Sequence, residues 1–188
     1  MKPFFSGLLY VMIIVGFTLS VQAQIESGNL FTDNNDIGNP LQKGSFRYLP
    51  DQQAYQITGA GENMWADHDA FHYAWRRVKG DFILRARIQF NESGGHPHRK
   101  TGLMLRSSLG EDAAYVDAVR HGDGLSAMQY RQTPGGDTRE IRLPVNHPSV
   151  LQLERKGNRF VVGAAEEGKP MVFTDTLNLK MDGNLYLG

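Results

Sequence analysis

The segment MWADHDAFHYAWRRV, residues 64–78, gathers side chains of the types that carry chemistry. His68 and His72 lie four positions apart, a spacing that on a helix would let both rings bind one zinc ion. The aromatic residues that follow favour a strand instead, on which the same spacing spans about 13 Å. Zinc needs both nitrogens at about 2.1 Å, so a strand excludes a shared site. We therefore expect no metal ligands here.

Two carboxylates, Asp67 and Asp69, flank the first histidine. On a strand they would lie about 6.6 Å apart on one face, near the separation of a glycosidase acid pair. In a loop leading into the strand they would instead satisfy backbone donors. The Glu-x-Asp-x-x-Glu strand signature of sandwich-fold glucanases is absent from the sequence. A glycoside hydrolase is thus the weaker alternative, and we expect a non-enzyme without catalytic residues.

Two further polar clusters are more typical of the loops that connect strands than of metal or ligand sites. His96 and His98 lie in the glycine-rich stretch 92–100, where no third metal ligand is evident. Asp123 lies in HGDG, which is most simply a turn; a calcium or sugar ligand there is an alternative without further support. No nucleotide-binding or nucleophile motif is present in the sequence. We expect no cofactor and no metal.

The elements that position these residues are short strands. In 81–90 the apolar side chains alternate with Arg85, Arg87 and Gln89, which is the pattern of a half-buried strand. The same pattern recurs at intervals of about ten residues, separated by turns rich in glycine, as in an all-β sandwich. Further strands are expected at 54–58, 71–78, 101–108, 113–121, 125–132, 139–143, 150–156, 159–165, 171–175 and 184–188. Gly157 and Asn158 predict a tight hairpin between two of them.

This alternation predicts a polar strand face that could bind a ligand. The residues expected to line one side of one sheet are Arg85, Arg87, Arg106, Asp117, Gln129 and Arg131, with His72 beside them. Planar polar side chains near an aromatic ring such as Trp65 or Trp75 are what sugar recognition uses. The alternative is a solvated face whose arginines pair with acids across the strands.

Within 71–78 the alternation separates two sets of side chains. Phe71, Tyr73 and Trp75 are expected on the core face, and His72 on the opposite face with Ala74 and Arg76. Residues 65–69 become the loop that leads into the strand.

The N-terminal segment indicates an exported protein, and the composition limits its partners. Residues 1–23 combine Lys2, an apolar run and a Val-Gln-Ala site, so they predict a secretory signal peptide, with an uncleaved N-terminal anchor as the alternative. Without Lys2 the 20 basic residues become 19 against 20 acidic ones, a balance that gives no electrostatic case for binding nucleic acid. The mature chain, 24–188, is expected in the periplasm or outside the cell, with no membrane contact after cleavage. It contains no cysteine, so disulfides are excluded.

Three segments resemble a known family. TGLMLRSSLGEDAAYVDAVRHGDGLSAMQYRQTPGG (101–136), GENMWADHDAFHYAWRRVKGDF (61–82) and DIGNPLQKGSF (36–46) are similar, in this order, to bacterial secreted domains of the concanavalin A-like lectin/glucanase superfamily. The most similar subgroup precedes TolB-like β-propellers in exported proteins, some of them named biopolymer transporter TolB/TolR. In that subgroup the strand matching NLYLG (184–188) continues into a further strand. The resemblance therefore implies that 24–188 is a domain truncated at its C-terminus.

The resemblance implies a jelly-roll sandwich of two antiparallel sheets with an accessory role, and it supplies no catalytic residues. Together with the polar face, it predicts an exported, non-catalytic module that binds carbohydrate or a similar ligand on the concave sheet face. The alternative is a structural module that docks on a downstream TolB-like β-propeller.

Overall fold

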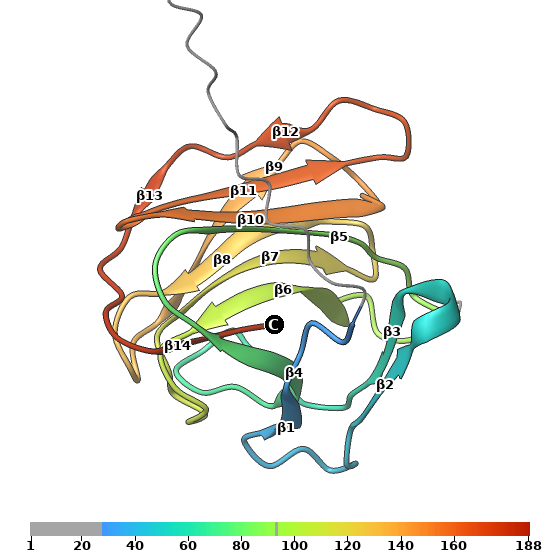
Figure 1. The fold of residues 1–188 in the computed structure, drawn as a ribbon, viewed down its shortest axis with the longest axis horizontal. Coiled ribbons are helices and arrows are strands. Elements are labelled where there is room, and N and C mark those ends of the chain that lie inside the picture. Colours follow the sequence, from blue (N-terminus) through green and yellow to red (C-terminus); the bar gives the residue numbers. More distant parts are fainter. Residues whose placement is uncertain (1–27, 93) are drawn as a thin grey trace, which may run out of the picture.

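The computed structural model describes residues 28–92 and 94–188, which form two antiparallel sheets packed as a sandwich. The larger, seven-stranded sheet has the order β1 (Asp33–Ile37), β4 (Phe71–Val78), β14 (Leu185–Leu187), β6 (Lys100–Arg106), β7 (Tyr115–His121), β8 (Ser126–Arg131) and β9 (Thr138–Leu143). The five-stranded sheet contains β12 (Val172–Phe173), β11 (Arg159–Ala165), β10 (Val150–Lys156) and β5 (Phe82–Arg87), with β13 (Leu177–Asn178) also paired to β11. In Figure 1, β10, β11 and β12 lie together at the top, and β1 and β4 at the bottom. The expected all-β sandwich of antiparallel sheets is confirmed.

One apolar core fills the space between the two sheets. Leu103 and Leu105 of β6 meet Leu151 and Leu153 of β10 there, all at most 5% exposed. Strand β5 turns Phe82, Leu84 and Ala86 toward this core and its arginines toward solvent, as its alternation predicts. Burying each large aliphatic side chain contributes about 1.5–3 kcal/mol. The core therefore accounts for the sandwich without disulfides.

We call the face of the seven-stranded sheet that is turned away from the five-stranded sheet the outer face. Alternate residues of β6 to β9 point there, in rows set by the strand register. One row consists of Met104, Asp117, Gln129 and Glu140, and the next of Arg106, Tyr115, Arg131 and Thr138. Segment 63–69 crosses this face, because the Tyr115 hydroxyl donates to the Met64 carbonyl and the Thr138 hydroxyl to that of Ala66.

Strand β4 adds a second, smaller apolar cluster on the outer face. Phe71, Tyr73 and Trp75 share one face of the strand, as expected, and pack with Met104 and Tyr115. This cluster is separate from the core between the sheets, because its residues lie on the outer face. The expected core face of β4 therefore packs into this second cluster and not into the core between the sheets.

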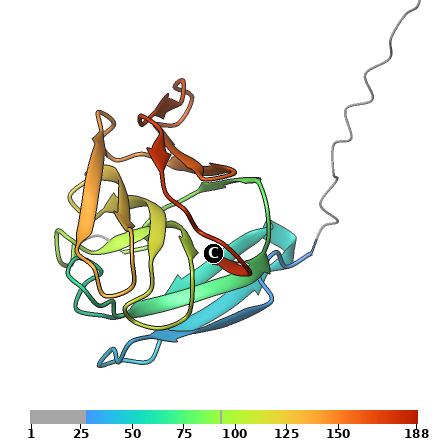
Figure 2. The same cartoon turned by 90° about the vertical axis from the view of Figure 1, so that its left-hand side faces the viewer.

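A two-stranded hairpin covers the other face of β4. It consists of β2 (Ser45–Leu49) and β3 (Ala54–Thr58), joined by the short 3₁₀ turn η1 (Pro50–Gln52). Its aromatic rings pack on one another and on Phe31; Phe46 and Tyr55, for example, stack with centroids 5.7 Å apart. In Figure 2 this cyan hairpin lies alongside the green strand β4.

Most strands were predicted, and four of them, β3, β4, β10 and β11, have the expected bounds. The tight hairpin after β10 is also confirmed, with Gly157 at φ 60°, whereas Asn158 does not take a positive φ. The predicted signal peptide, 1–23, lies outside the described residues. Within 28–92 and 94–188, no helix is long and apolar enough to cross a membrane.

Candidate functional site

The structure separates the residues that the sequence placed on one polar face. Asp117, Gln129, Arg106 and Arg131 do share the outer face. Arg85 and Arg87 do not, because β5 pairs with β10 in the other sheet. That part of the prediction is wrong: alternation shows which residues share a face of a strand, but not which sheet the strand joins.

The expected place of His72 beside this face is also wrong. The ring lies on the opposite face of β4, buried near the hairpin residues Gly44 and Gly59. Its Nδ1 lies 2.8 Å from Oδ1 of Asp36, and hydrogen bonding with His72 lowers the pKa of that carboxyl. His72 therefore joins β4 to β1 and to the hairpin and has no access to a ligand on the outer face.

The two arginines of β5 lie on the solvent side of the five-stranded sheet. Arg85 Nε donates to Gln152 Oε1, and Arg87 forms an exposed ion pair of 2.7 Å with Glu167. Exposed ion pairs of this kind contribute little to stability. This surface matches the solvated face that the sequence left open as an alternative.

Arg106 and Arg131 are on the outer face, but both are completely buried around Asp69. Arg106 Nη1 donates to Asp69 Oδ2 at 2.6 Å, and Arg131 donates to both carboxylate oxygens at 2.8 and 2.9 Å. Their remaining donors reach backbone carbonyls, such as Gly110 for Arg106 and Ala66 for Arg131. These charges are satisfied within the chain and fix segment 63–69 onto the sheet.

This arrangement also bears on the predicted carboxylate pair. Asp69 is 0% exposed with both oxygens held by arginines, whereas Asp67 is exposed and pairs with His68 at 2.8 Å. The two acids therefore do not face a common space in which a glycosidic bond could lie between them.

The polar side chains left for a ligand surround Asp117. Its Oδ1 accepts from the Gln129 backbone N–H at 2.9 Å, while its Oδ2 is buried and has no hydrogen-bond partner among the described residues. Gln129 Oε1 and His121 Nδ1, from the same two strands, are likewise buried without a partner in the described part of the chain. Buried polar atoms are normally satisfied, so three neighbouring exceptions mark this patch as unusual.

The environment of this patch sets the charge of each group. Burial raises the pKa of Asp117 to about 8, and burial together with the Lys100 charge lowers the pKa of His121 to about 4. Burial opposes ionisation of Glu140, but hydrogen bonds from Arg142 and Gln129 outweigh it and lower its pKa. At neutral pH the patch thus combines a neutral acid, a neutral imidazole and one carboxylate.

Trp65 and Lys100 border the patch. Trp65, from segment 63–69, is 45% exposed. The Lys100 ammonium lies 5.8 Å from the centre of its ring and donates to Asn63 Oδ1 at 3.1 Å. An exposed indole beside polar groups offers a flat apolar surface for stacking.

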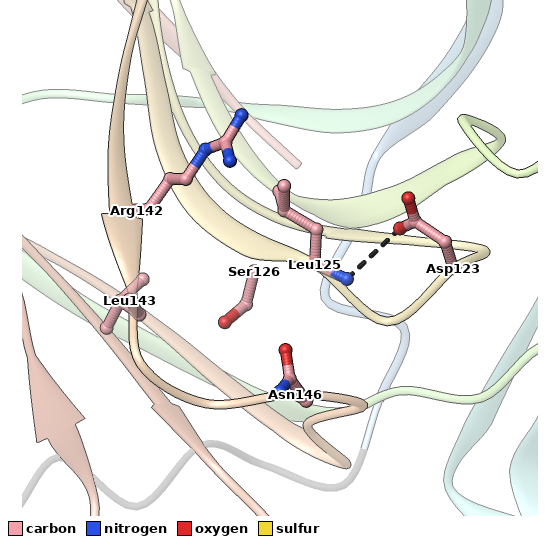
Figure 3. Close-up of a pocket in the computed structure, with 6 residues that line it drawn as sticks. All are labelled: Asp123, Leu125, Ser126, Arg142, Leu143 and Asn146. Atoms are coloured by element: carbon pink, nitrogen blue, oxygen red, sulfur yellow. Dashed lines mark hydrogen bonds between the residues drawn. The ribbon is translucent and has the colours of Figure 1, made fainter.

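An open pocket of about 290 Å³ lies at the ends of β8 and β9 and is drawn in Figure 3. Arg142 lines the pocket, and its Nε donates to Glu140 Oε1 at 2.6 Å; the other oxygen of Glu140 accepts from Gln129 Nε2 at 2.8 Å. Asp123 lies at the pocket rim, where it accepts from the Leu125 backbone N–H at 3.1 Å (Figure 3). Hydrogen bonds through Glu140 therefore join Arg142 of the pocket to Gln129 of the patch.

The described residues offer no grouped metal ligands. Within 28–92 and 94–188, no three His, Asp or Glu side chains are grouped so that they could hold a metal ion. His96 and His98 lie in an exposed loop, with the His98 ring 5.8 Å from that of His121.

Sequence reasoning found Asp117, Gln129 and Trp65 but missed Lys100, His121 and Glu140. Lys100 was assigned to a loop, whereas it opens β6 and pairs in register with His121. Glu140 stands in the same register row as Asp117 and Gln129. If the alternation of side chains between the two faces is continued to the ends of these strands, it places all three residues on the outer face.

Comparison with known proteins finds no matching family model, no matching curated protein and no matching solved structure. The function must therefore be inferred from the antiparallel sandwich and from the chemistry of its outer face.

Proposed function

We propose that this chain is an exported, non-catalytic module of the concanavalin A-like jelly-roll type that binds carbohydrate on the outer face of its seven-stranded sheet. The observation that carries the proposal is the group of three buried, unpartnered polar atoms on Asp117, His121 and Gln129, beside the exposed ring of Trp65. Sugars present hydroxyl groups, which both donate and accept hydrogen bonds, next to apolar C–H faces.

Each group has a place in this proposal. Neutral Asp117 can donate and accept, Gln129 Oε1 accepts, and the Glu140 carboxylate accepts from a sugar hydroxyl. The C–H face of the sugar stacks on Trp65. The Lys100 side chain moves aside when the sugar enters. It can do so because, among the described residues, its ammonium donates a hydrogen bond only to Asn63 Oδ1. The pocket at Arg142 leaves room for a chain longer than one sugar.

Glycan binding by the purified mature chain tests the proposal. A glycan array identifies a ligand, and isothermal titration then compares Trp65→Ala with the unaltered chain. We expect the Trp65→Ala variant to lose about tenfold or more in affinity, since aromatic anchors dominate such interfaces. Phe173→Ala is the matched control, because Phe173 is as exposed, at 46% against 45%, but lies in the other sheet. A chain that binds no glycan, or binds one equally well without Trp65, contradicts the proposal.

Docking on a neighbouring domain such as a β-propeller is the second candidate. It is favoured by three exposed apolar side chains in the five-stranded sheet, Ile83, Val172 and Phe173. Exposed apolar surface of this kind is common at contacts between domains. If the array is negative, this candidate becomes the leading one.

A further inference from the structure

The unpartnered atoms of the patch around Asp117 have defined hydrogen-bonding roles. Gln129 Nε2 donates to Glu140 Oε2 at 2.8 Å and lies 3.4 Å from Nε2 of His121. An amide nitrogen only donates, so His121 Nε2 is the acceptor of this pair, and the single proton of the neutral ring is on Nδ1. His121 Nδ1, which is buried and has no partner among the described residues, is therefore a hydrogen-bond donor.

Asp117 presents a second donor. Its Oδ1 accepts from the Gln129 backbone N–H, so the proton that burial keeps on this acid at neutral pH is on Oδ2. This Oδ2 is buried and has no partner within 28–92 and 94–188. Of the three unpartnered atoms of the patch, Gln129 Oε1 alone is an acceptor. A ligand that fits these atoms thus offers more acceptors than donors.

Lys100 brings a charge without a counter-ion to the same patch. Its ammonium has three N–H groups, and its only hydrogen bond to a described residue goes to Asn63 Oδ1, at 3.1 Å. Burial lowers the pKa of Lys100 more than the surrounding carboxyl groups raise it. The described residues therefore leave this charge uncompensated, and a ligand anion would compensate it.

The arginines of the outer face are already paired. Arg142 Nε lies 2.6 Å from Glu140 Oε1, and Arg106 and Arg131 share the carboxylate of Asp69. An anion that enters the patch would therefore bind the lysine ammonium without breaking an existing ion pair.

This ammonium lies beside the surface on which a sugar would stack. It is 5.8 Å from the centre of the Trp65 ring, which is 45% exposed. A sugar stacked on the indole would have its ring substituents next to the ammonium. A carboxylate substituent has about four lone-pair positions and no donor, so it can accept from Lys100 and from Asp117 Oδ2–H together.

We propose that the patch selects glycans of uronic acids, whose carboxylate binds the Lys100 ammonium while the sugar ring stacks on Trp65. The inference rests on the proposed glycan binding and adds the class of sugar. It makes Lys100 the residue that determines specificity, because the side chain stays bound to the ligand after it has moved aside. Charge-assisted hydrogen bonds are roughly twice as strong as neutral ones, so the acid form of the sugar binds more tightly than a neutral form.

Isothermal titration of the mature chain with matched oligosaccharides tests the selection. The probes are oligomers of galacturonic, mannuronic and glucuronic acid, each compared with its carboxyl-reduced form, which keeps the stereochemistry and loses the charge. We expect at least one acid probe to bind about tenfold or more tightly than its reduced form.

Three variants assign this preference to the lysine. Lys100→Gln should abolish the preference and still bind the reduced form, and Lys100→Arg should retain the preference because it retains the charge. Lys169→Gln is the matched control, because it removes the same charge from an exposed residue of the connection between β11 and β12. This control variant should prefer the acid probe as the unaltered chain does.

Four results would overturn the inference. Binding of neutral glycans only, or equal binding of the acid and reduced forms, would remove the selection and leave glycan binding in place. A preference that survives Lys100→Gln, or that Lys169→Gln abolishes as well, would show that Lys100 does not determine it. Equally tight binding of a sulfated form of the reduced probe would show recognition of charge alone. If neither the probes nor any glycan on the array binds, the proposed function fails together with this inference.

Discussion

At the scale of single residues, Asp69 matters most for stability. It is 0% exposed and is the only carboxylate among the described residues that pairs with Arg106 and Arg131. Replacing it by Asn leaves two buried guanidinium groups without a counter-charge, so we expect Asp69→Asn to lower the free energy of unfolding by about 3–5 kcal/mol. Urea denaturation measures this. Asp67→Asn is the control, since that side chain is exposed, and an equal loss in both variants would contradict the assignment.

Asp117 gives a pH dependence at the same scale. Its pKa is about 8 in the folded chain against 3.8 ordinarily, because burial disfavours the charge. Between pH 4 and 8 the unfolded chain therefore releases a proton that the folded chain keeps, so stability falls as pH rises and levels off above pH 8. We expect Asp117→Asn to remove this fall.

Denaturation of both chains at several pH values checks the prediction. The difference in unfolding free energy between the variant and the unaltered chain should grow in favour of the variant from pH 4 to 8. His121, whose lowered pKa costs stability at acid pH, is present in both chains and does not affect the direction of this difference. A difference that is constant with pH would mean that the pKa of Asp117 is the same in the folded and the unfolded chain, and would contradict the prediction.

Residue types and alternation placed Asp117 and Gln129 together on one face, and the structure agrees. The same reasoning made Arg106 and Arg131 available to a ligand, which they are not. Their partner Asp69 lies 37 and 62 residues earlier, in a loop. Local periodicity carries no information about a contact of that separation, so the burial of both arginines could not be predicted.

At the scale of elements, Gly102 determines how closely β6 approaches β7. A Cβ there would stand 2.1 Å from the Ala118 carbonyl oxygen, so the two backbones would have to separate. We expect Gly102→Ala to destabilise the fold by about 1–3 kcal/mol, as overpacking does. Thermal unfolding measures it against Gly110→Ala, where the nearest atoms belong to the flexible side chains of Asp112 and Ser108. Similar melting temperatures for both variants would contradict this role.

One of the strands that sequence reasoning missed, β1, has a tertiary cause. Strand β1, Asp33–Ile37, reads DNNDI, a composition that favours turns over strands. It is extended because it pairs with β4 along its whole length, which is a tertiary effect. Strands with alternating apolar residues, such as β10 and β11, were predicted to the residue, since their burial is encoded locally.

At the scale of the whole molecule, the two sheets differ in what they carry. The seven-stranded sheet bears the polar patch and the pocket, and the five-stranded sheet closes the core behind it. Composition and turn spacing predicted the sandwich. They could not predict that β14, near the end of the chain, lies in the middle of the larger sheet, because pairing over such distances has no local signal.

The ion pairs of Asp69 also have a consequence for the order in which the chain folds. Strands β6, β7 and β8 follow one another and pair as neighbours, so their contacts are local and can form early. Asp69 must close loops of 37 and 62 residues to reach its arginines, a slower step that needs the three strands in place. Segment 63–69 is thus expected to pack onto the sheet late in folding. A change in the fluorescence of Trp65, which lies within the segment, reports this step.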